Sequence, residues 1–421
     1  MALVSELDLP TFDATEPSMR GERFHEAMDA LREQGWLAQG PFGYIVLDRE
    51  SAEFFLRTKA AIFPGMKIAE IFGVPQGPLY EQMEHNILQV NGPDHSRLRG
   101  LVNPALSPRA VERYRPAMRG FLEGLLDEAV DLARDTDGPN VRCEFVEAFA
   151  KPYPSQVIAD VMGAPLEDAP RLHHWSNWIQ RQFDAVSMAT EIEQIEQAVE
   201  EFYDYARALL SARRETPGED LISKLIAAEE EGDRLSESEC INLVFNVLVG
   251  GVDTSQSQLA HAIRLLAEDP RQWTALREDP SLAGAAVEEA LRYEPITPFT
   301  ARILTEDVEY RDVSFPEGSV VMVCAFTGNR DLDDESRADS FDITGEDRTS
   351  GGRPARPLTF GAGVHYCLGA NLARAELEEA LAFFARRLDT LELAGHPDYE
   401  GVGGIYGLAS LPVRFTLAPA V

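Results

Sequence analysis

Residues 360–369 read Phe360-Gly361-Ala362-Gly363-Val364-His365-Tyr366-Cys367-Leu368-Gly369 and lead into an apolar, alanine-rich run from Ala370 to Phe384. The apolar residues of this run recur at helical spacing, which predicts a helix that begins just after Cys367. A helix N-terminus carries partial positive charge and favours a thiolate. The glycines allow sharp turns and let the backbone approach a large flat ligand. The stretch therefore predicts a cysteine thiolate that binds a soft or borderline metal.

Two other interpretations of this loop are weaker. A buried structural cysteine on a glycine-rich turn would leave the neighbouring motifs unexplained. A dinucleotide-binding loop is excluded, because Tyr366 stands where the third glycine of the phosphate-binding fingerprint is required.

Composition favours one large domain over residues 1–421. The chain has 421 residues, 44% of them hydrophobic, and shows neither an internal repeat nor a Pro/Gly/Ser-rich linker. Lys and Arg total 38 against 71 Asp and Glu, a formal charge of −33, which argues against nucleic acid and anionic membranes as partners. Four cysteines without paired spacing indicate a reducing compartment, and Met1 to Glu16 does not resemble a signal peptide. We expect a soluble, cytoplasmic protein that has no membrane anchor.

The patterns predict a mainly helical chain. Helices are expected at 24–34, 52–58 (capped by Asp48), from Ser107-Pro108, and at 118–132, 144–162, 172–183, 192–212, 237–268 and 282–293. A hairpin is expected at 36–47, and short strands at 301–310, 319–324 and 412–417. Residues 62–91 have no firm period and predict an apolar loop, either a lid or a core cover.

The long predicted helix 237–268 begins at a capping box, Ser236-x-x-Glu239, and contains Gly250-Gly251-Val252-Asp253-Thr254. Each mid-helix glycine costs roughly 1 kcal/mol relative to alanine, which is tolerable where something flat lies against the backbone. Thr254 can bond back to the Gly250 carbonyl and open the helical ladder. Asp253 beside Thr254 pairs an acid with an alcohol, which suits proton delivery to activated oxygen. The alternative is a packing helix kinked by glycine, with a solvated aspartate.

The pattern Phe-x-x-Gly-x-His-x-Cys-x-Gly closely resembles the haem-binding signature of the cytochrome P450 family, and related motifs extend from His95 to Cys367. The resemblance implies a mainly α fold with small β-sheets, in which haem b lies between the long central helix and the cysteine loop. Cys367 would be the axial iron ligand, which favours O–O cleavage. Phe360, Gly369 and Gly250 would contact the haem, and Asp253 and Thr254 match the acid–alcohol pair of the family.

Haem propionates need cations, and the resemblance implies four of them. His95 and Arg99 lie four residues apart on one predicted helical face, and Arg302 and His365 match two further positions; a guanidinium can bind a carboxylate bidentately. Glu289-x-x-Arg292 resembles the pair that supports the cysteine loop, although an exposed pair of this spacing contributes little by itself. Residues Phe341–Thr344 resemble the meander of the family, but Gly345, which follows them, stands where many members carry arginine, and Arg348 is a possible substitute. His173 and His174 are interpreted as helix surface.

By resemblance, the protein is a haem-thiolate monooxygenase that hydroxylates or epoxidises an apolar small molecule. Electrons would come from NAD(P)H through a reductase and a ferredoxin or flavodoxin-type donor, and the protein would be monomeric. Basic residues at 97, 99, 109, 113, 115 and 119 either form the docking site for that donor or pair with local acids. The alternatives are a peroxide-driven peroxygenase, which typically lacks the acid–alcohol pair, and a non-catalytic haem sensor or carrier.

The substrate pocket is expected beside the central helix, where Asn246 and Val249 lie on or near the face of Thr254. A buried asparagine without partners costs roughly 1–3 kcal/mol, so Asn246 indicates a ring-containing apolar substrate with a hydroxyl or carbonyl group, unless it bonds to a lid helix. The other expected wall residues are Phe72, Thr297, Phe299, Ile405 and Tyr406.

Overall fold

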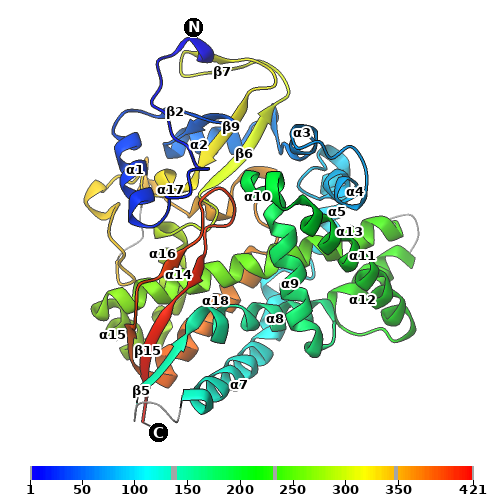
Figure 1. Cartoon of the computed structure of the whole chain (residues 1–421), viewed down its shortest axis with the longest axis vertical. Coiled ribbons are helices and arrows are strands. Elements are labelled where there is room, and N and C mark those ends of the chain that lie inside the picture. Colours follow the sequence, from blue (N-terminus) through cyan, green and yellow to red (C-terminus); the bar gives the residue numbers. More distant parts are fainter. Residues whose placement is uncertain (1, 134–139, 231–234, 346–348, 420–421) are drawn as a thin grey trace.

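The computed structural model describes residues 2–133, 140–230, 235–345 and 349–419. It confirms a mainly helical fold with small sheets. The sheet that contains β1 and β7 lies near the N-terminus, and the sheet that contains β5 and β15 lies near the C-terminus, at the opposite end of the molecule (Figure 1). Within the described residues, no helix has both the length and the apolar character needed to cross a membrane.

The helices surround a core to which residues from Ala69 to Phe415 contribute. They are α1 (Glu22–Arg32), α2 (Arg49–Arg57), α3 (Gly65–Ile71), α4 (Pro78–His85), α5 (Gly92–Val102), α6 (Pro108–Val111), α7 (Arg115–Ala133), α8 (Pro152–Met162), α9 (Ala169–Gln180), α10 (Ala185–Thr190), α11 (Ile192–Glu215), α12 (Leu221–Glu230), α13 (Glu237–Gly251), α14 (Asp253–Glu268), α15 (Pro270–Glu278), α16 (Ala283–Tyr293), α17 (Ala325–Gly328) and α18 (Ala370–Arg387).

The strands form five small sheets in the described part of the chain, in the orders β2-β3-β9-β6-β4, β12-β15-β5, β1-β8-β7, β10-β11 and β13-β14. Their bounds are β1 (Ala2–Leu3), β2 (Leu37–Gly40), β3 (Gly43–Val46), β4 (Ala61–Ile62), β5 (Asn140–Glu144), β6 (Phe299–Leu304), β7 (Val308–Tyr310), β8 (Val313–Phe315), β9 (Val320–Cys324), β10 (Thr349–Ser350), β11 (Arg353–Pro354), β12 (Leu388–Leu393), β13 (Asp398–Tyr399), β14 (Leu408–Ser410) and β15 (Pro412–Leu417).

Local signals in the sequence predict several elements correctly. The expected hairpin is β2–β3, and the Asp48 side chain accepts a hydrogen bond from the Ser51 amide at 2.8 Å to cap α2. Ser107 caps α6, and the capping box of Ser236 and Glu239 opens α13. These features depend on residues close together in the chain, which is why composition and spacing reveal them.

Two segments differ from the expectation. Residues 62–91, predicted as a loop, contain the short helices α3 and α4, whose inner side chains pack against the main core. The predicted helix 144–162 starts later: Asn140–Glu144 is strand β5, paired with β15, a π-helical turn follows at Val146–Ala150, and α8 begins at Pro152. Both depend on tertiary packing or on pairing with residues far along the chain.

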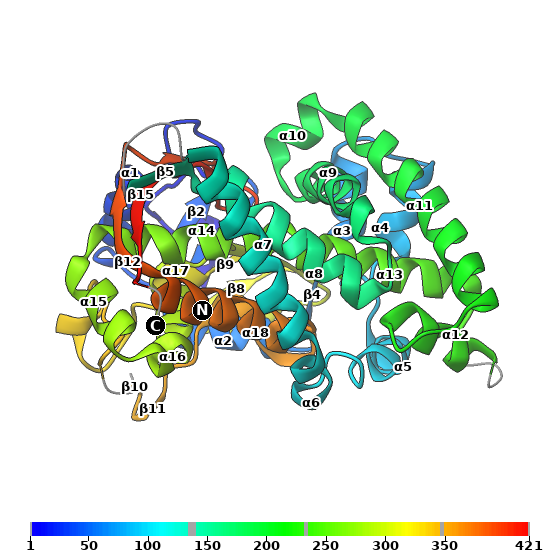
Figure 2. The ribbon, with the colours of Figure 1, turned by 90° about the horizontal axis from the view of Figure 1, so that it is seen from below.

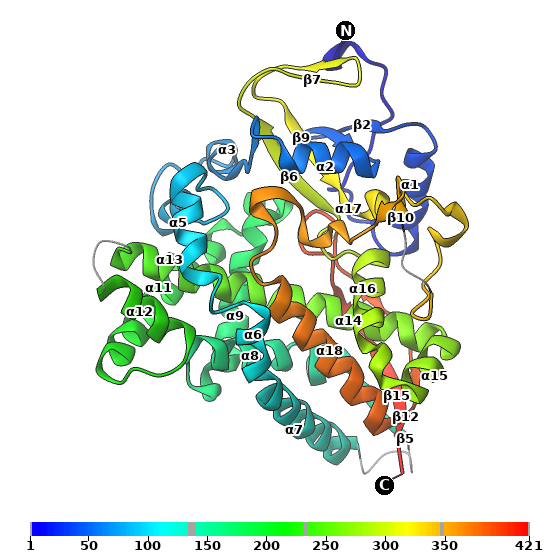
Figure 3. The ribbon, with the colours of Figure 1, turned by 180° about the vertical axis from the view of Figure 1, so that it is seen from behind.

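The predicted helix 237–268 crosses the middle of the molecule as two helices, α13 and α14, separated at Val252 (Figure 1). Its partners include α8, α9 and α16, and α18 packs against α14, α16 and α7 (Figure 3). From below, the helices α3, α4, α9, α10 and α11 gather toward the α13 end of this central pair, and the sheet β12-β15-β5 lies toward its α14 end (Figure 2). The loop Phe360–Gly369 leads directly into α18.

Candidate active site

The loop before α18 is folded tightly around the cysteine. The Cys367 amide donates to the Phe360 carbonyl at 2.9 Å, and Gly361 and Gly363 have φ angles of +68° and +74°. A Cβ atom on Gly363 would come within 2.6 Å of the Leu56 carbonyl oxygen at the end of α2. Any other residue at position 363 would therefore be strained and would collide with α2.

Burial raises the pKa of the Cys367 thiol above its ordinary value. Backbone amides of Gly369 and Ala370, at the start of α18, and the charges of Arg99 and Arg374 act in the opposite direction. The helix terminus therefore lowers the pKa of the thiol, as the sequence predicts, but burial raises it by more when no metal is bound. A coordinating metal would deprotonate the thiol outright, so the loop suits a metal-bound thiolate.

Two arginines and two histidines gather on the side of Cys367 toward α5 and β6: Arg99, Arg302, His95 and His365. The rings of His95 and His365 lie 4.4 Å apart, and the charges of His95, Arg302 and Arg99 all act on His365. Arg302 is 5% exposed and donates to the carbonyl of its chain neighbour, Ala301. None of the four forms an ion pair with an acidic side chain in the part of the chain that the structure describes.

The electrostatics of this cluster indicate a missing anion. Burial lowers the pKa of Arg302 to about 10, and burial together with the neighbouring charges lowers that of His365 to about 4. The buried Nε2 of His95 has no hydrogen-bond partner among the described residues. Buried cations are normally paired. A group with two carboxylates, such as haem with its propionates, fits this cluster, and Cys367 supplies the iron ligand.

An open surface runs along one face of the central helices. From Cys240 to Ala267, every residue is buried except Asn246, Gly250, Gly251 and Thr254. Asn246, Gly250 and Thr254 are four residues apart and so share a face. A Cβ on Gly250 would meet nothing within 4 Å, whereas one on Gly251 would lie 2.3 Å from Ile158 Cδ1. Gly250 therefore faces free space, as a flat cofactor requires, and Gly251 serves the contact with α8.

The two residues of the acid–alcohol pair, Asp253 and Thr254, have their hydrogen-bond partners on different helices. Thr254 Oγ1 donates to the Gly250 carbonyl at 2.6 Å, as the sequence predicts. Asp253 is 5% exposed and turns toward α9, where it accepts from Ser176 Oγ at 2.5 Å and from Asn177 Nδ2 at 3.3 Å. Burial raises the pKa of Asp253, while these hydrogen bonds and the charge of His173 oppose the rise. A solvated aspartate is thereby excluded.

Several expected wall residues keep accessible surface. Phe72, Asn246, Thr297 and Ile405 are half-buried, and Val249 is buried with its carbonyl accepting from Gln180. Asn246 Nδ2 donates to the Asn242 carbonyl at 2.6 Å, within its own helix rather than to a lid helix. This bond uses one of the two N–H groups of the amide and leaves the second N–H and the Oδ1 acceptor without a described partner.

Two residues that were expected to line the pocket, Tyr406 and Phe299, pack against other aromatic side chains instead. Tyr406 has no exposed surface: it lies against Phe24 and His261, and its hydroxyl accepts from the Gly21 amide. Phe299 packs on Phe12 and Phe24, and alternation along β6 puts it on the strand face opposite Arg302. Both were assigned by their place in the chain, which does not specify side-chain direction.

Two further assignments need correction. His173, expected on the helix surface, is half-buried and its Nε2 lies 2.9 Å from Gln256 Oε1 on α14. The pair Glu289–Arg292 is buried and bidentate, with both contacts at 2.9 Å, and Arg292 also donates to the carbonyls of Ala338 and Ser340. The pair therefore holds the segment at 338–340 in place and is not a solvent-exposed ion pair. The possible substitute Arg348 lies outside the described residues.

The basic cluster between α5 and α7 is mostly paired with acids. Arg97 pairs with Glu239 and Asp94, Arg115 with Glu112, Glu378 and Glu379, and Arg119 with Glu379. Arg109 and Arg113 are exposed, and neither forms an ion pair within the described part of the chain. The two remain available for a partner.

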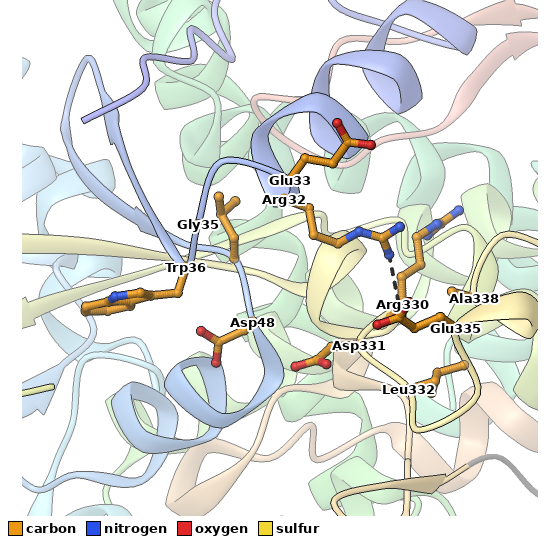
Figure 4. Close-up of a pocket in the computed structure, with 11 residues that line it drawn as sticks. Arg32, Glu33, Gly35, Trp36, Asp48, Arg330, Asp331, Leu332, Glu335 and Ala338 are labelled. Carbon is orange, nitrogen blue, oxygen red and sulfur yellow. Dashed lines mark hydrogen bonds between the residues drawn. The ribbon is translucent and has the colours of Figure 1, made fainter. Parts of the chain in front are cut away.

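A separate pocket of about 450 Å³ opens between α1, α2 and the segment after α17 (Figure 4). Its charged groups satisfy one another: Arg32 donates to the Arg330 carbonyl, and both arginines pair with Asp339. None of the active-site residues described above lines it.

Comparison with known proteins agrees with this geometry. The family model "Cytochrome P450" matches residues 44–397. Luteothin monooxygenase from Streptomyces thioluteus is 35% identical over 412 residues, 98% of this chain and 97% of the relative. The polyketide biosynthesis cytochrome P450 PksS of Bacillus subtilis is 33% identical over 335 residues, 79% of this chain and 78% of that protein. The crystal structure of CalO2 superposes with a TM-score of 0.86 at 32% identity, covering 97% of this chain and 99% of that one.

Proposed function

The chain belongs to the cytochrome P450 family and is a monooxygenase, and we propose that it hydroxylates or epoxidises an apolar, ring-containing small molecule that carries a hydroxyl group. One observation carries this proposal. The side chains of His95, Arg99, Arg302 and His365 gather near Cys367, and none of them pairs with an acidic side chain among the described residues. We take residues 1–421 as one such domain.

Each side chain of the site has a role in this proposal. Cys367 holds the iron of haem b, and the four cations hold its propionates. Bound there, haem supplies the iron at which dioxygen is reduced, so that one oxygen atom enters the substrate and the other leaves as water. Thr254 positions a proton donor at the open face, and Asp253 supplies protons to it. The burial of Asp253 limits the entry of bulk water.

The substrate class is inferred from the open face and the relatives. The wall combines apolar surface with the amide of Asn246, whose Oδ1 can accept a hydrogen bond and whose second Nδ2 hydrogen can donate one, since only one N–H binds the Asn242 carbonyl. A substrate hydroxyl could bond to both groups, whereas a carbonyl could only accept from Nδ2, so we propose a hydroxyl. The PksS relative is named for polyketide biosynthesis, and we propose a polyketide product as the substrate.

Electrons come, in this proposal, from a ferredoxin or flavodoxin-type protein that is reduced by NAD(P)H. The loop around Cys367 exposes Val364 and Tyr366, 70% and 38% accessible. Helix α6, with Arg109, packs beside the start of α18 through the bond from Asn371 to the Leu106 carbonyl. We call Val364, Tyr366, Arg109 and Arg113 the docking surface.

The haem assignment is tested on the purified holoenzyme. Reduced and exposed to carbon monoxide, it should show the strongly red-shifted Soret band of a thiolate ligand, and Cys367→Ala should abolish that band. Cys324→Ala serves as the control, since Cys324 is buried elsewhere in the core. Loss of the band in the control but not in Cys367→Ala would refute the assignment.

The substrate assignment is tested by optical titration. A library of terpenes, steroids, aromatics and polyketides would be screened for the high-spin shift, and hydroxylated hits compared with their deoxygenated analogues. Asn246→Leu should reduce the preference for the hydroxylated member by about tenfold, since the hydrogen bond to Oδ1 is lost. An unchanged preference would show that Asn246 does not recognise the hydroxyl group.

A further inference from the structure

Tyr406 joins three parts of the chain through its main-chain groups. Its amide donates to the Ile296 carbonyl at 2.8 Å, and its carbonyl oxygen lies 3.1 Å from Nε2 of His261 on α14. The chain neighbours of these groups, Thr297 and Ile405, are expected wall residues of the substrate pocket, and both are half-buried. We call Ile296, Tyr406 and His261 the wall junction, because they connect two expected walls to the central helix.

His261 contributes one hydrogen bond to this junction. It has no exposed surface, and burial lowers the pKa of its imidazole to about 3, although the charge of Glu294 opposes the change. The ring is therefore neutral near neutral pH, and because a carbonyl oxygen only accepts, Nε2 carries the hydrogen and donates it to Tyr406. The buried Nδ1 has no hydrogen-bond partner among the described residues, which is unfavourable. A leucine would fill similar space without that cost, so the bond to Tyr406 is what a histidine adds at this position.

The neighbouring turns of α14 hold the other segment of the wall junction. Gln258 and Arg264 lie three residues on either side of His261 and so share its face. Gln258 donates to the Glu294 carbonyl at 3.2 Å, and Arg264 donates to the Glu294 carboxylate at 2.6 Å. One row of buried polar side chains therefore holds both segments of the wall junction to the central helix.

The chain just before Ile405 lies against α10 on its other side. A Cβ atom on Gly403 would come within 2.6 Å of Asp184 Oδ2, and one on Gly404 within 3.2 Å of Asp184 Cβ. The Asp184 carboxylate caps α10, so this side chain has little freedom to move away. The position of Ile405 is therefore set from two sides, by α10 and by the wall junction.

We propose that His261 is a positioning residue, which sets the place of Ile405 through the Tyr406 carbonyl and thereby determines which ligands the pocket admits. The inference rests on the proposed function, in which Ile405 forms part of the pocket wall. Without the Nε2–H donor, the buried Tyr406 carbonyl loses a partner, and the chain around it should relax until the oxygen finds another. His261 thus acts on selectivity through Tyr406 and not by contact with the substrate.

The first measurement follows the position of Ile405 without turnover. In the reduced, carbon-monoxide-bound holoenzyme, the NMR signal of an isoleucine δ1-methyl group depends on its place relative to the haem ring, and Ile405 is assigned by its loss in Ile405→Val. His261→Leu removes the donor and should shift or split this signal, whereas His261→Gln offers an amide N–H at similar reach and should keep it in place. Ile263→Val, a buried truncation on the opposite face of α14, controls for general loosening of the helix and should also keep it.

The second measurement tests selectivity with two iron-binding probes, phenylimidazole and biphenylimidazole, which differ by one ring. Their dissociation constants are measured by optical titration of the ferric holoenzyme. A relaxed wall should favour the longer probe, so His261→Leu should change the ratio of the two constants by about tenfold, and His261→Gln should restore the native ratio. His261→Asn, whose amide is too short to reach Tyr406, should behave like the leucine variant and replaces it if that variant does not fold.

The outcomes separate this inference from the proposed function. If Ile405→Ala leaves the ratio of the two constants native, Ile405 does not line the pocket, and the proposed wall fails together with the inference. If Ile405→Ala changes the ratio but His261→Leu does not, the wall stands and the role of His261 is wrong. An unmoved Ile405 signal in His261→Leu also overturns the inference. If His261→Gln restores neither the signal nor the ratio, the packing of the imidazole rather than its bond positions Tyr406, and the inference is again overturned.

Discussion

The Thr254 hydroxyl is oriented by its own helix, through its 2.6 Å bond to the Gly250 carbonyl. This bond fixes the oxygen on the open face at the break between α13 and α14, where a proton donor is needed. Thr254→Ala should retain haem and ligand binding but form about tenfold less product per electron, because reduced oxygen escapes as peroxide. Product and peroxide per NADH are the measurements. Thr254→Ser keeps a hydroxyl and should remain coupled; equal coupling in the alanine variant would contradict the role.

Glu376, on α18, is a buried carboxyl whose environment favours the protonated form. Glu376 is 1% exposed. Ser255 lies close, but neither carboxyl oxygen has a well-formed hydrogen bond within the described residues. Burial raises the pKa of this carboxyl group from 4.5 to about 8. A raised carboxyl pKa in the folded state means that its contribution to stability is complete below pH 4.5 and is lost as pH rises toward about 8.

Glu376→Gln cannot ionise and should lose this dependence. Relative to the native holoenzyme, its free energy of unfolding should increase with pH by up to about 1.4 kcal/mol per pH unit across that window. Thermal unfolding midpoints measured at a series of pH values test this. Glu26→Gln, at an exposed position on α1, is the control and should follow the native protein. Parallel curves for Glu376→Gln and native protein would show that Glu376 is not protonated in the fold.

At the scale of elements, the central helix pair uses its two adjacent glycines differently. Gly250→Ala has room for its methyl group and should gain roughly 1 kcal/mol of helix propensity. Gly251→Ala drives a methyl group into Ile158, which is fully buried on α8, and should lose about 1–3 kcal/mol by overpacking. Thermal unfolding of the two haem-free proteins, in which no cofactor lies against Gly250, compares substitutions one residue apart.

A double variant identifies the cause. Ile158→Val removes the Cδ1 atom that a methyl group at position 251 would meet at 2.3 Å. Added to Gly251→Ala, it should recover part of the lost stability, although alone it destabilises by about 1 kcal/mol. Strictly additive losses would show that α8 does not determine the requirement for glycine.

The same elements show what sequence could predict. The cysteine loop, the caps at Asp48 and Ser236 and the bond from Thr254 to Gly250 are local patterns, and they were correct. The pairing of β5 with β15 joins residues about 270 positions apart, and the short helices α3 and α4 depend on packing against the core, so neither leaves a periodic signal. Side-chain direction at Phe299 and Tyr406, and the contact of His173 with Gln256, required coordinates for the same reason.

On the scale of the whole molecule, charge is distributed so that one small surface differs from the rest. The chain carries −33, so an acidic electron donor is repelled at long range by most of the surface. Within the basic cluster, Arg97, Arg115 and Arg119 are paired with acids, whereas Arg109 and Arg113 are exposed and form no ion pair among the described residues. Association steered by charge is fastest at low salt.

Charge reversal on the docking surface should therefore slow reduction in a salt-dependent way. Arg109→Glu with Arg113→Glu should lower the second-order rate of haem reduction by a surrogate ferredoxin by about tenfold at low salt, and by less at high salt where charges are screened. Stopped-flow reduction over a salt series measures this. Arg271→Glu, on the exposed surface of α15 at the far end of α18 (Figure 3), adds the same kind of charge away from the docking surface and should change the rate little. An equal effect of Arg271→Glu would mean that total charge, rather than this surface, controls the encounter. If the rate of haem reduction fell equally at all salt concentrations, the substitutions would have damaged the haem loop instead of removing electrostatic steering.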